Sequence, residues 1–162
     1  MDDKGDIQAV NEIADYKSCN QIVYLETRKH QDLYMHVART PEGPSAKFHI
    51  VNVHTMDELK LTGNCMMGSR PFLNFDSKFN ERIHFKVMKQ LLADAFGTPL
   101  GHPKSKPFHD RVMSFFLVKN NIWVRNYQVV NKDDKKDSSV NLVEIGPRLV
   151  FIPYNLDRCW VS

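Results

Sequence analysis

Cysteine is scarce in this sequence, and the spacings that cysteine chemistry requires are missing. The three cysteines, Cys19, Cys65 and Cys159, lie far apart in 162 residues, and no CxxC pair occurs. An odd and scattered set of this kind indicates neither a disulfide framework nor a zinc site. Such cysteine usage fits a reducing compartment best.

Catalytic and metal-binding motifs are also missing. The seven histidines include no HExxH-type spacing, which is the local pattern that a metal site needs. There is no GxSxG elbow and no cysteine in a nucleophile signature. Carboxylate pairs such as Asp57-Glu58 are adjacent in sequence, and adjacent side chains do not face each other in a strand or a helix. We therefore expect no enzyme, no metal, no cofactor and no small-molecule substrate.

One glycine-rich segment superficially resembles a phosphate-binding loop. It runs from Gly63 to Gly68 and continues with Ser69-Arg70-Pro71. A phosphate-binding loop needs Lys and then Ser or Thr after its second glycine, with a strand before it and a helix after it. Neither condition is met here, so we interpret the segment as a turn-rich link.

Long apolar runs and a strong charge of one sign are absent as well. No stretch approaches the length of a membrane-spanning helix, so no membrane partner is expected. The first six residues, 1–6, have neither the basic lead nor the apolar run of a signal peptide. The formal net charge is only +3, and 42% of the residues are hydrophobic. This composition is typical of one globular domain and permits a polyanionic partner without requiring one.

The most informative stretch that is present is 140–153. It contains two short apolar runs, Leu142–Ile145 and Leu149–Ile152, separated by Gly146-Pro147-Arg148. Runs rich in β-branched and aromatic residues are typical of buried strands, and Gly-Pro forces a bend or bulge between them. The side chain of Arg148 is expected to be exposed at this bend. It is either an arginine that extends to water from a core strand or a binding residue.

The longest expected helix is Glu81–Phe96. Phe85, Met88, Leu91, Leu92 and Ala95 recur at helical spacing, and Gly97 and Pro99 form a strong stop signal. We expect this apolar face to pack on strands at 111–118, 122–130 and 140–152. The remaining expected elements are a helix at Ile7–Ser18 with Asp6 as N-cap, a helical turn at Met56–Leu61, strands at Gln21–Glu26, Asp32–Ala38, Lys47–Val53, 72–75, Arg111–Val118 and Ile122–Val130, and loops at Leu100–Phe108 and Lys132–Ser139.

These elements give a mixed α/β (α+β) fold class. Two strand-and-helix units follow one another at 7–69 and 70–153, within a single domain spanning 1–162. The last residues, 154–162, are expected to form a divergent tail.

Several sequence blocks resemble one protein family, the Brix-domain family. The bent stretch carries the first block, Leu142-Val143-Glu144-Ile145-Gly146-Pro147-Arg148. The other matching blocks, in chain order, are Arg28-Lys29-His30-Gln31-Asp32-Leu33-Tyr34, His54-Thr55-Met56-Asp57-Glu58-Leu59, Gly63-Asn64-Cys65, Gly68-Ser69-Arg70-Pro71, Lys104-Ser105-Lys106-Pro107-Phe108 and Ile122-Trp123-Val124-Arg125. Together they cover about Ile7 to Pro153.

The resemblance implies a role and a fold. It implies a non-catalytic ribosome biogenesis factor of the nucleus and nucleolus, which binds precursor ribosomal RNA during assembly of the large (60S) subunit. Its partners would be that RNA, other large-subunit assembly factors and ribosomal proteins. The family fold comprises two similar α/β halves that resemble an anticodon-binding domain.

The sequence departs from the family at both ends. Family members carry a strand and a long helix before the region that matches Ile7, and residues 154–162 do not match the Gly-rich, aromatic family segment. We therefore expect a shortened domain with an incomplete first half. The missing helix would leave one sheet face of that half, including Ile22, Tyr24 and Phe48, open to water.

The basic residues are the remaining candidates for function. We predict that Arg70, Lys104, Lys106, Arg111 and Arg148 form a surface that contacts RNA phosphates, since they lie at element ends and bends of the matching blocks. Trp123, Arg125 and Tyr127 alternate along one strand face and could stack nucleobases. They could equally line a half-buried sheet face, and burial is the usual environment of a residue such as Trp123.

A protein–protein adaptor is the alternative function. In that interpretation the strand edges and the aromatic sheet face hold a partner peptide, with little direct RNA contact. The two functions differ in salt dependence, because phosphate binding weakens steeply with salt and mainly apolar docking does not.

Overall fold

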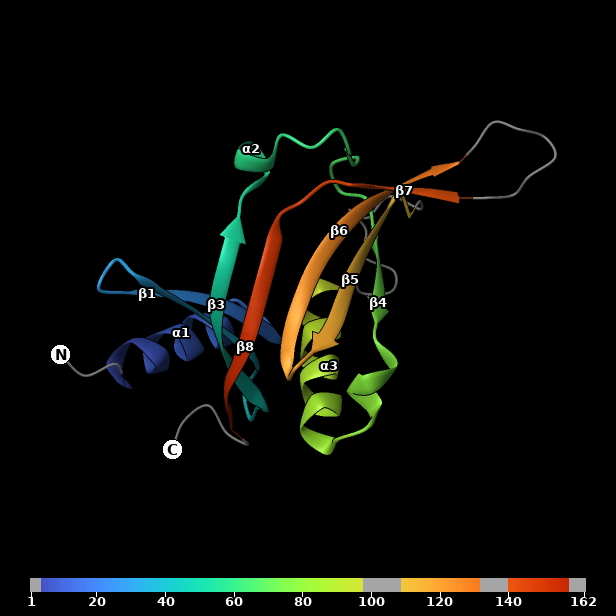
Figure 1. Cartoon of the computed structure of the whole chain (residues 1–162). Coiled ribbons are helices and arrows are strands. Elements are labelled where there is room, and N and C mark those ends of the chain that lie inside the picture. Colours follow the sequence, from blue (N-terminus) through green and yellow to red (C-terminus); the bar gives the residue numbers. More distant parts are fainter. Residues whose placement is uncertain (1–3, 98–108, 132–139, 158–162) are drawn as a thin grey trace.

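A single mixed sheet of eight strands organises the molecule. The computed structural model describes residues 4–97, 109–131 and 140–157. Seven strands follow the spatial order β1-β2-β3-β8-β6-β5-β4, and β7 pairs with β6 off this path (Figure 1). The strands are β1 (Gln21–Arg28), β2 (Asp32–Arg39), β3 (Ser45–His54), β4 (Pro71–Phe75), β5 (Arg111–Val118), β6 (Asn121–Asn131), β7 (Val140–Glu144) and β8 (Arg148–Asp157). The expected mixed α/β fold class is confirmed.

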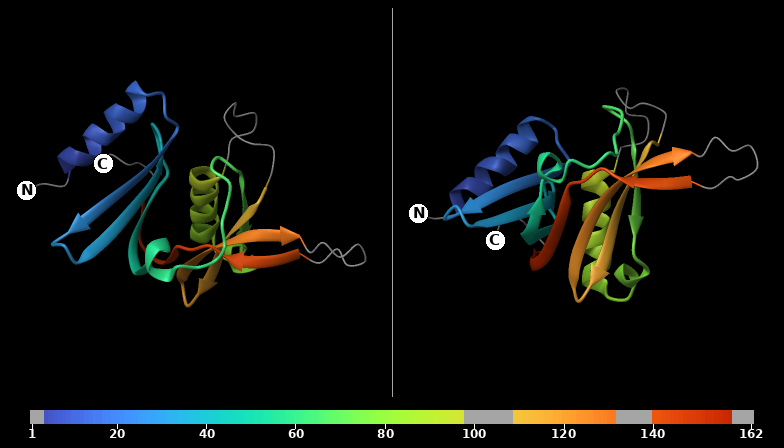
Figure 2. Two further views of the ribbon diagram at one scale, coloured as in Figure 1. Left: turned by 90° about the horizontal axis from the view of Figure 1, so that it is seen from above. Right: turned by 45° about the horizontal axis from the view of Figure 1, so that its top comes forward.

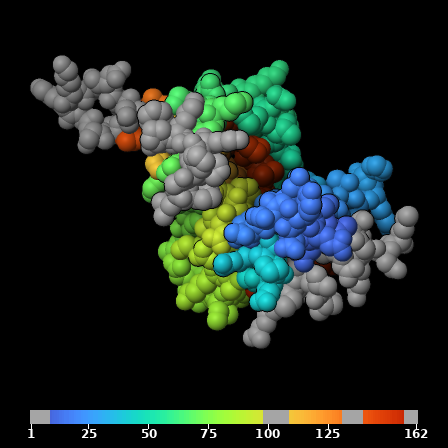
Figure 3. All heavy atoms as spheres, turned by 180° about the vertical axis from the view of Figure 1, so that it is seen from behind, coloured from blue at the N-terminus to red at the C-terminus, as the bar shows by residue number. Residues whose placement is uncertain are grey.

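The two long helices lie against different parts of this sheet. They are α1 (Lys4–Tyr16) and α3 (Ile83–Phe96), and two short elements accompany them, α2 (Met56–Leu59) and the 3-10 helix η1 (Ser77–Asn80). Helix α3 lies behind β5, β6 and β8 in Figure 1, whereas α1 lies across the β1–β2 hairpin from α3 in the view from above in Figure 2. Both helices are visible from behind in Figure 3. Within the described residues, β5 and β6 therefore have no long helix over the face that points away from α3.

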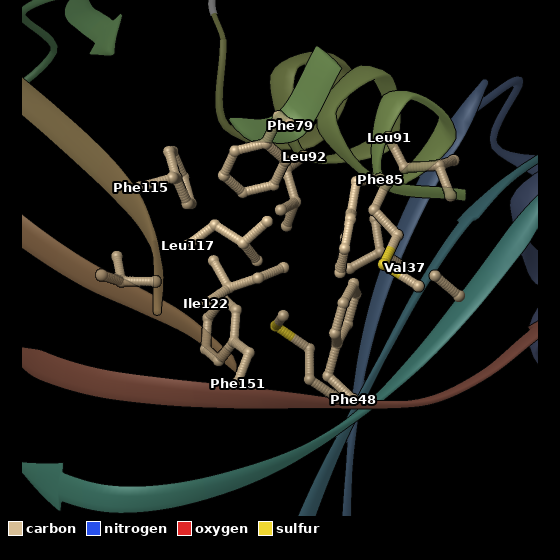
Figure 4. Close-up of a cluster of buried hydrophobic side chains, with 14 of the residues drawn as sticks. Val37, Phe48, Phe79, Phe85, Leu91, Leu92, Phe115, Leu117, Ile122 and Phe151 are labelled. Carbon is tan, nitrogen blue, oxygen red and sulfur yellow. The ribbon is translucent and has the colours of Figure 1, made fainter. Parts of the chain in front are cut away.

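The hydrophobic core lies between α3 and the strands. The predicted stripe of α3 is confirmed, since Phe85, Met88, Leu91 and Leu92 are all buried. Figure 4 shows Phe85, Leu91 and Leu92 facing residues from both parts of the sheet. The other core residues are Met35, Val37, Ala46, Phe48 and Ile50 of β2 and β3, Phe79 of η1, and Phe115, Leu117, Ile122, Val124 and Phe151 of β5, β6 and β8. One continuous core thus joins strands that lie before and after residue 70.

The bend at 145–147 is present as the sequence indicates. Gly146 has φ +86, a left-handed conformation that favours glycine. The chain on its two sides pairs with different parts of β6: Glu144 of β7 aligns with Tyr127, and Leu149 of β8 aligns with Val124. Beyond the bend, β8 also pairs with β3. Because of the Gly-Pro break, the chain before it pairs with one part of β6, and the chain after it pairs with another part of β6 and with β3.

The turn-forming residues in the sequence also predicted the hairpins correctly. Val118 and Asn121 are directly paired, and the two residues between them, Lys119 and Asn120, have φ 50 and φ 66. Two residues with positive φ are characteristic of the tight hairpin turn that fits twisted strands. The predicted hairpin at 111–130 is thereby confirmed, as is the one formed by β2 and β3. The helical turn after Thr55 is present as α2.

Several predicted boundaries were wrong. The first helix begins at Lys4, so Asp6 lies inside it and is not its N-cap. The long helix begins at Ile83 rather than at residue 81, because η1 comes first and Asp76 accepts a hydrogen bond from the Lys78 N–H at its start. Strand β8 continues to residue 157 and pairs with β3 beyond position 153. The expected loops at 100–108 and 132–139 lie outside the described residues.

The expected exposure of the first half was wrong in its main point. Phe48 is fully buried and Ile22 is 9% exposed. The reason is that α3, which follows much later in the chain, lies over the same side of β2 and β3 and covers Phe48 (Figure 4). Ile22 and Tyr24 lie on the other side of the sheet from Phe48, where Ile22 is buried and Tyr24 is half-buried, so α3 does not account for the burial of Ile22.

Among the helices that the structure describes, none has the length and apolar character needed to cross a membrane.

Candidate nucleic-acid interface

The face of the sheet that points away from α3 carries an aromatic and cationic surface. Side chains alternate along a strand, so Ile122 and Val124 of β6 point into the core, whereas Trp123, Arg125 and Tyr127 point to the opposite face. We call this opposite side the open face. The expected alternation of these three residues is therefore present.

An exposed aromatic pair lies on the open face near the turn that joins β5 and β6. Trp123 of β6 is directly opposite Phe116 of β5, and the two side chains are 37% and 38% exposed. Trp123 is therefore neither fully buried nor free, and Arg125 and Tyr127 are half-buried, which agrees with the half-buried sheet face that the sequence left open as an alternative. Full burial of a tryptophan on a strand needs a second layer on its side of the sheet, and α3 supplies that layer only on the other side of β5 and β6.

Cations accompany this pair. The guanidinium carbon of Arg125 lies 5.3 Å from the centre of the Trp123 ring, within the range of a cation–π contact. Arg148 donates two hydrogen bonds to Glu144, from Nε at 2.8 Å and from Nη2 at 2.7 Å. The Nε of Arg125 lies 3.8 Å from the same carboxylate. Two arginines thus share one carboxylate beside the aromatic pair.

This arrangement fixes the ionisation of Glu144 and orients Arg148. The hydrogen bond with Arg148 is the main cause that lowers the pKa of Glu144, and it raises the pKa of Arg148. A bidentate pair of this kind holds the guanidinium plane in one orientation. The described residues give Nη1 of Arg148 no hydrogen-bond partner, so that edge can receive a ligand acceptor. The arginine predicted at the bend is therefore both paired and accessible, with its side chain 39% exposed.

The other predicted cations lie elsewhere or outside the described residues. Arg111 aligns with Pro71 and alternates with the core residue Phe115, which places it on the helix side of the sheet. It donates a 3.5 Å hydrogen bond to the Ser69 carbonyl oxygen, and its Nε has no partner among the described residues. Arg70 precedes β4 and is half-buried.

Lys104 and Lys106 fall in the segment 98–108, which is not described. The five predicted residues therefore do not all share one sheet face: Arg148 is on the open face and Arg111 on the helix face. Their role in RNA contact stays a prediction.

A second cluster on the open face was not predicted from the sequence. Glu26 of β1 forms ion pairs with Arg28 and with Lys47 Nζ at 3.2 Å, and a 3.2 Å hydrogen bond with Nε2 of His36, whose pKa is lowered by burial. Burial alone would raise the pKa of Glu26, but these hydrogen bonds outweigh it and lower the pKa to about 2. Lys47 Nζ also lies 4.7 Å from the centre of the Tyr34 ring. The cluster joins three strands, and only their register brings these residues together.

The glycine-rich link has a structural role at the edge of this surface. A Cβ on Gly63 would lie 2.5 Å from the Glu144 carbonyl oxygen, so the link passes directly against the backbone of β7. The Asn64 N–H donates a 2.9 Å hydrogen bond to the Gln128 side chain. Interpretation of this segment as a link is consistent with these contacts.

Within the described ranges, no three His, Cys, Asp or Glu side chains gather in a way that could hold a metal ion. What the open face offers is aromatic rings and oriented cations, which can stack planar groups and bind anions.

Comparison with known proteins identifies the family. The Brix domain model matches residues 2–155. The Ribosome biogenesis protein BRX1 homolog of Dictyostelium discoideum is 49% identical over 150 residues, covering 93% of this chain and 45% of that protein. Ribosome biogenesis protein brx1 of Schizosaccharomyces pombe is 47% identical over 156 residues, covering 96% and 53%. The human Ribosome biogenesis protein BRX1 homolog is 49% identical over 150 residues, covering 93% and 41%.

The chain spans about half the length of the curated relatives that it matches. Their names agree with the sequence blocks, which resemble the family member called Brix more than its paralogues. A model match over nearly the whole length and identities near one half leave the assignment clear: the chain belongs to the Brix domain family.

Proposed function

We propose that this chain acts without catalysis in the assembly of the large (60S) ribosomal subunit, by holding precursor ribosomal RNA. Family membership and the names of the relatives support a role in ribosome biogenesis. The same role implies the nucleus and nucleolus as its location. Other assembly factors and ribosomal proteins would be its neighbours in the particle.

The observation that supports RNA contact most directly is the arginine pair at Glu144. Arg148 is held by two hydrogen bonds, Arg125 lies on the other side of the carboxylate, and the two arginines leave one net positive charge. An oriented guanidinium on a surface that no long helix covers is suited to a phosphate, because arginine binds phosphate through a planar fork of N–H donors.

The phosphate-contacting residues that we propose are Arg70, Lys104, Lys106, Arg111 and Arg148. Phosphate contacts position an RNA and carry most of the affinity, whereas the shape of the RNA and its unpaired bases supply the choice of site. The mild net charge of +3 fits a protein that binds at one place in a larger particle rather than along any polyanion.

The salt dependence of RNA affinity tests this proposal against the adaptor function. Affinity for single-stranded and hairpin fragments of large-subunit precursor RNA is measured by fluorescence anisotropy over a series of salt concentrations. We expect the logarithm of the association constant to fall linearly with the logarithm of salt concentration, by about 0.7 for each phosphate contact. No measurable binding, or an affinity that does not change with salt, would contradict direct RNA contact and favour the adaptor.

A further inference from the structure

We infer that Trp123 and Phe116 form a stacking site for unpaired bases of single-stranded RNA on the open face. This inference rests on the proposed function and adds to it the class of RNA and the residues that receive the bases. Arg125 is the cation of the site, and Arg148 is the nearest further arginine.

The position of the aromatic pair argues for a ligand. Phe116 and Trp123 belong to the neighbouring strands β5 and β6, two residues before Val118 and two residues after Asn121, which flank the tight turn of the hairpin. They are directly opposite each other, and more than a third of each side chain is exposed. Beyond Trp123, the next strand presents Val150 on the same face. Exposed aromatic residues that are grouped on one sheet face are typical of a binding surface.

The charge beside the pair indicates a nucleic acid as the ligand. Arg125 lies over the Trp123 ring at 5.3 Å, and Arg148 is oriented by Glu144. Among the described strands β4, β5, β6, β7 and β8, these two arginines and Glu144 are the charged side chains that alternation places next to the pair. Arg125 is 19% exposed and donates a 2.8 Å hydrogen bond to the Val124 carbonyl oxygen, whereas Arg148 is 39% exposed. An apolar protein partner would require burial of Arg148, whereas RNA supplies a phosphate for its exposed guanidinium.

The geometry also favours unpaired bases over a duplex. In a double helix the base faces are already stacked on one another, and an A-form duplex offers a protein its minor groove, its hydroxyls and its phosphates. A flat aromatic pair can bind only a base whose face is free. Stacking of this kind tolerates different bases because each has a π-face.

The intrinsic fluorescence of Trp123 provides the assay. The chain has two tryptophans, Trp123 and Trp160, so Trp160→Phe leaves Trp123 as the only one. This single-tryptophan protein is titrated with a short oligouridylate and, separately, with an RNA duplex of equal length. We expect saturable quenching by the single strand and little quenching by the duplex.

Substitution at Trp123 then separates stacking from simple apolar contact. Trp123→Leu keeps an apolar side chain and removes the ring, and it should weaken single-strand affinity about 5- to 150-fold. The salt slope should stay unchanged, because no phosphate contact is lost. Trp123→Phe should retain most of the affinity, and Arg125→Gln should lower the slope by about one unit.

Tyr16→Leu provides the matched control. Tyr16 is 84% exposed at the end of α1, outside strands β5 and β6, so its substitution should leave affinity within about twofold of the parent. Thermal unfolding of every variant checks that the fold is kept.

The two possible failures are distinguishable. A parent chain that binds single-stranded RNA with a steep salt slope, without quenching and with equal affinity for the Trp123→Leu variant, would overturn the stacking site and leave the proposed function standing. A parent chain that binds no RNA would overturn both.

Discussion

Removal of the Phe48 side chain tests the single core that α3 forms with both parts of the sheet. Phe48 lies on β3 with no exposed surface, and its ring centre is 5.7 Å from that of Phe151 on β8. Substitution of a buried phenylalanine by alanine costs about 3–5 kcal/mol, from lost burial and from the cavity that remains. Domains have total stabilities of about 5–15 kcal/mol, so Phe48→Ala should remove a large fraction of the stability.

Equilibrium unfolding in urea measures this cost. The transition is followed by far-UV circular dichroism for the whole chain and by tryptophan fluorescence of the Trp160→Phe protein, in which Trp123 reports on β6. Both signals should move together to lower urea concentration, because the core residues on β3 and β6 belong to one cluster. Leu25→Ala is the control: Leu25 is 57% exposed on β1, and its loss should change stability by about 0.5 kcal/mol or less.

Two outcomes would contradict a single core that joins both parts of the sheet. If Phe48→Ala costs no more than Leu25→Ala, the inner face of β3 is open to water, as the sequence alone suggested. If the circular dichroism transition shifts and the Trp123 transition does not, the two parts of the sheet have separate cores.

Three further predictions concern charge, backbone packing and RNA contact. Glu26 has its pKa lowered from 4.5 to about 2, so its ion pairs stabilise the fold above pH about 4.5 and are lost as the pH falls towards about 2. The stability difference between the parent and Glu26→Gln, about 1–3 kcal/mol at neutral pH, should therefore shrink over that interval in urea titrations, and a constant difference would contradict the ion-pair cluster. Gly63→Ala should cost about 1–3 kcal/mol, because a Cβ meets the Glu144 carbonyl oxygen at 2.5 Å, and a neutral substitution would show that the link does not pass against β7. Replacement of Lys104 and Lys106 together by alanine should lower the salt slope of RNA affinity by about one to two units, and an unchanged slope would exclude that segment from the interface.

Local signals in the sequence were enough for most of the elements. The stripe from Phe85 to Leu92 predicted the buried face of α3, and Gly97 marks its end. Asn120 predicted the tight turn of the β5–β6 hairpin. The Gly146-Pro147 break separates two strands, as expected. Each of these features depends on residues close together in the chain, where spacing and turn chemistry decide the conformation.

The pairing of strands that lie far apart in the chain could not be predicted from such local patterns. No local pattern indicates that β8 lies between β3 and β6, yet this placement joins the two parts of the sheet. The position of α3 over Phe48 follows from that topology, which is why the expected exposure of the first half was wrong. The Glu26 cluster likewise depends on the register of three strands. The alternation of Trp123 and Arg125 was visible in the sequence, but the side of the sheet left open was not.

The central claim is that this chain holds precursor ribosomal RNA during assembly of the large subunit. The most direct test is ultraviolet crosslinking of the full chain in cells, followed by sequencing of the attached RNA, with an untagged strain as the background. The account predicts crosslinks that concentrate at defined positions of the large-subunit precursor RNA. Recovery at the background level, or an even spread over unrelated RNAs, would contradict it.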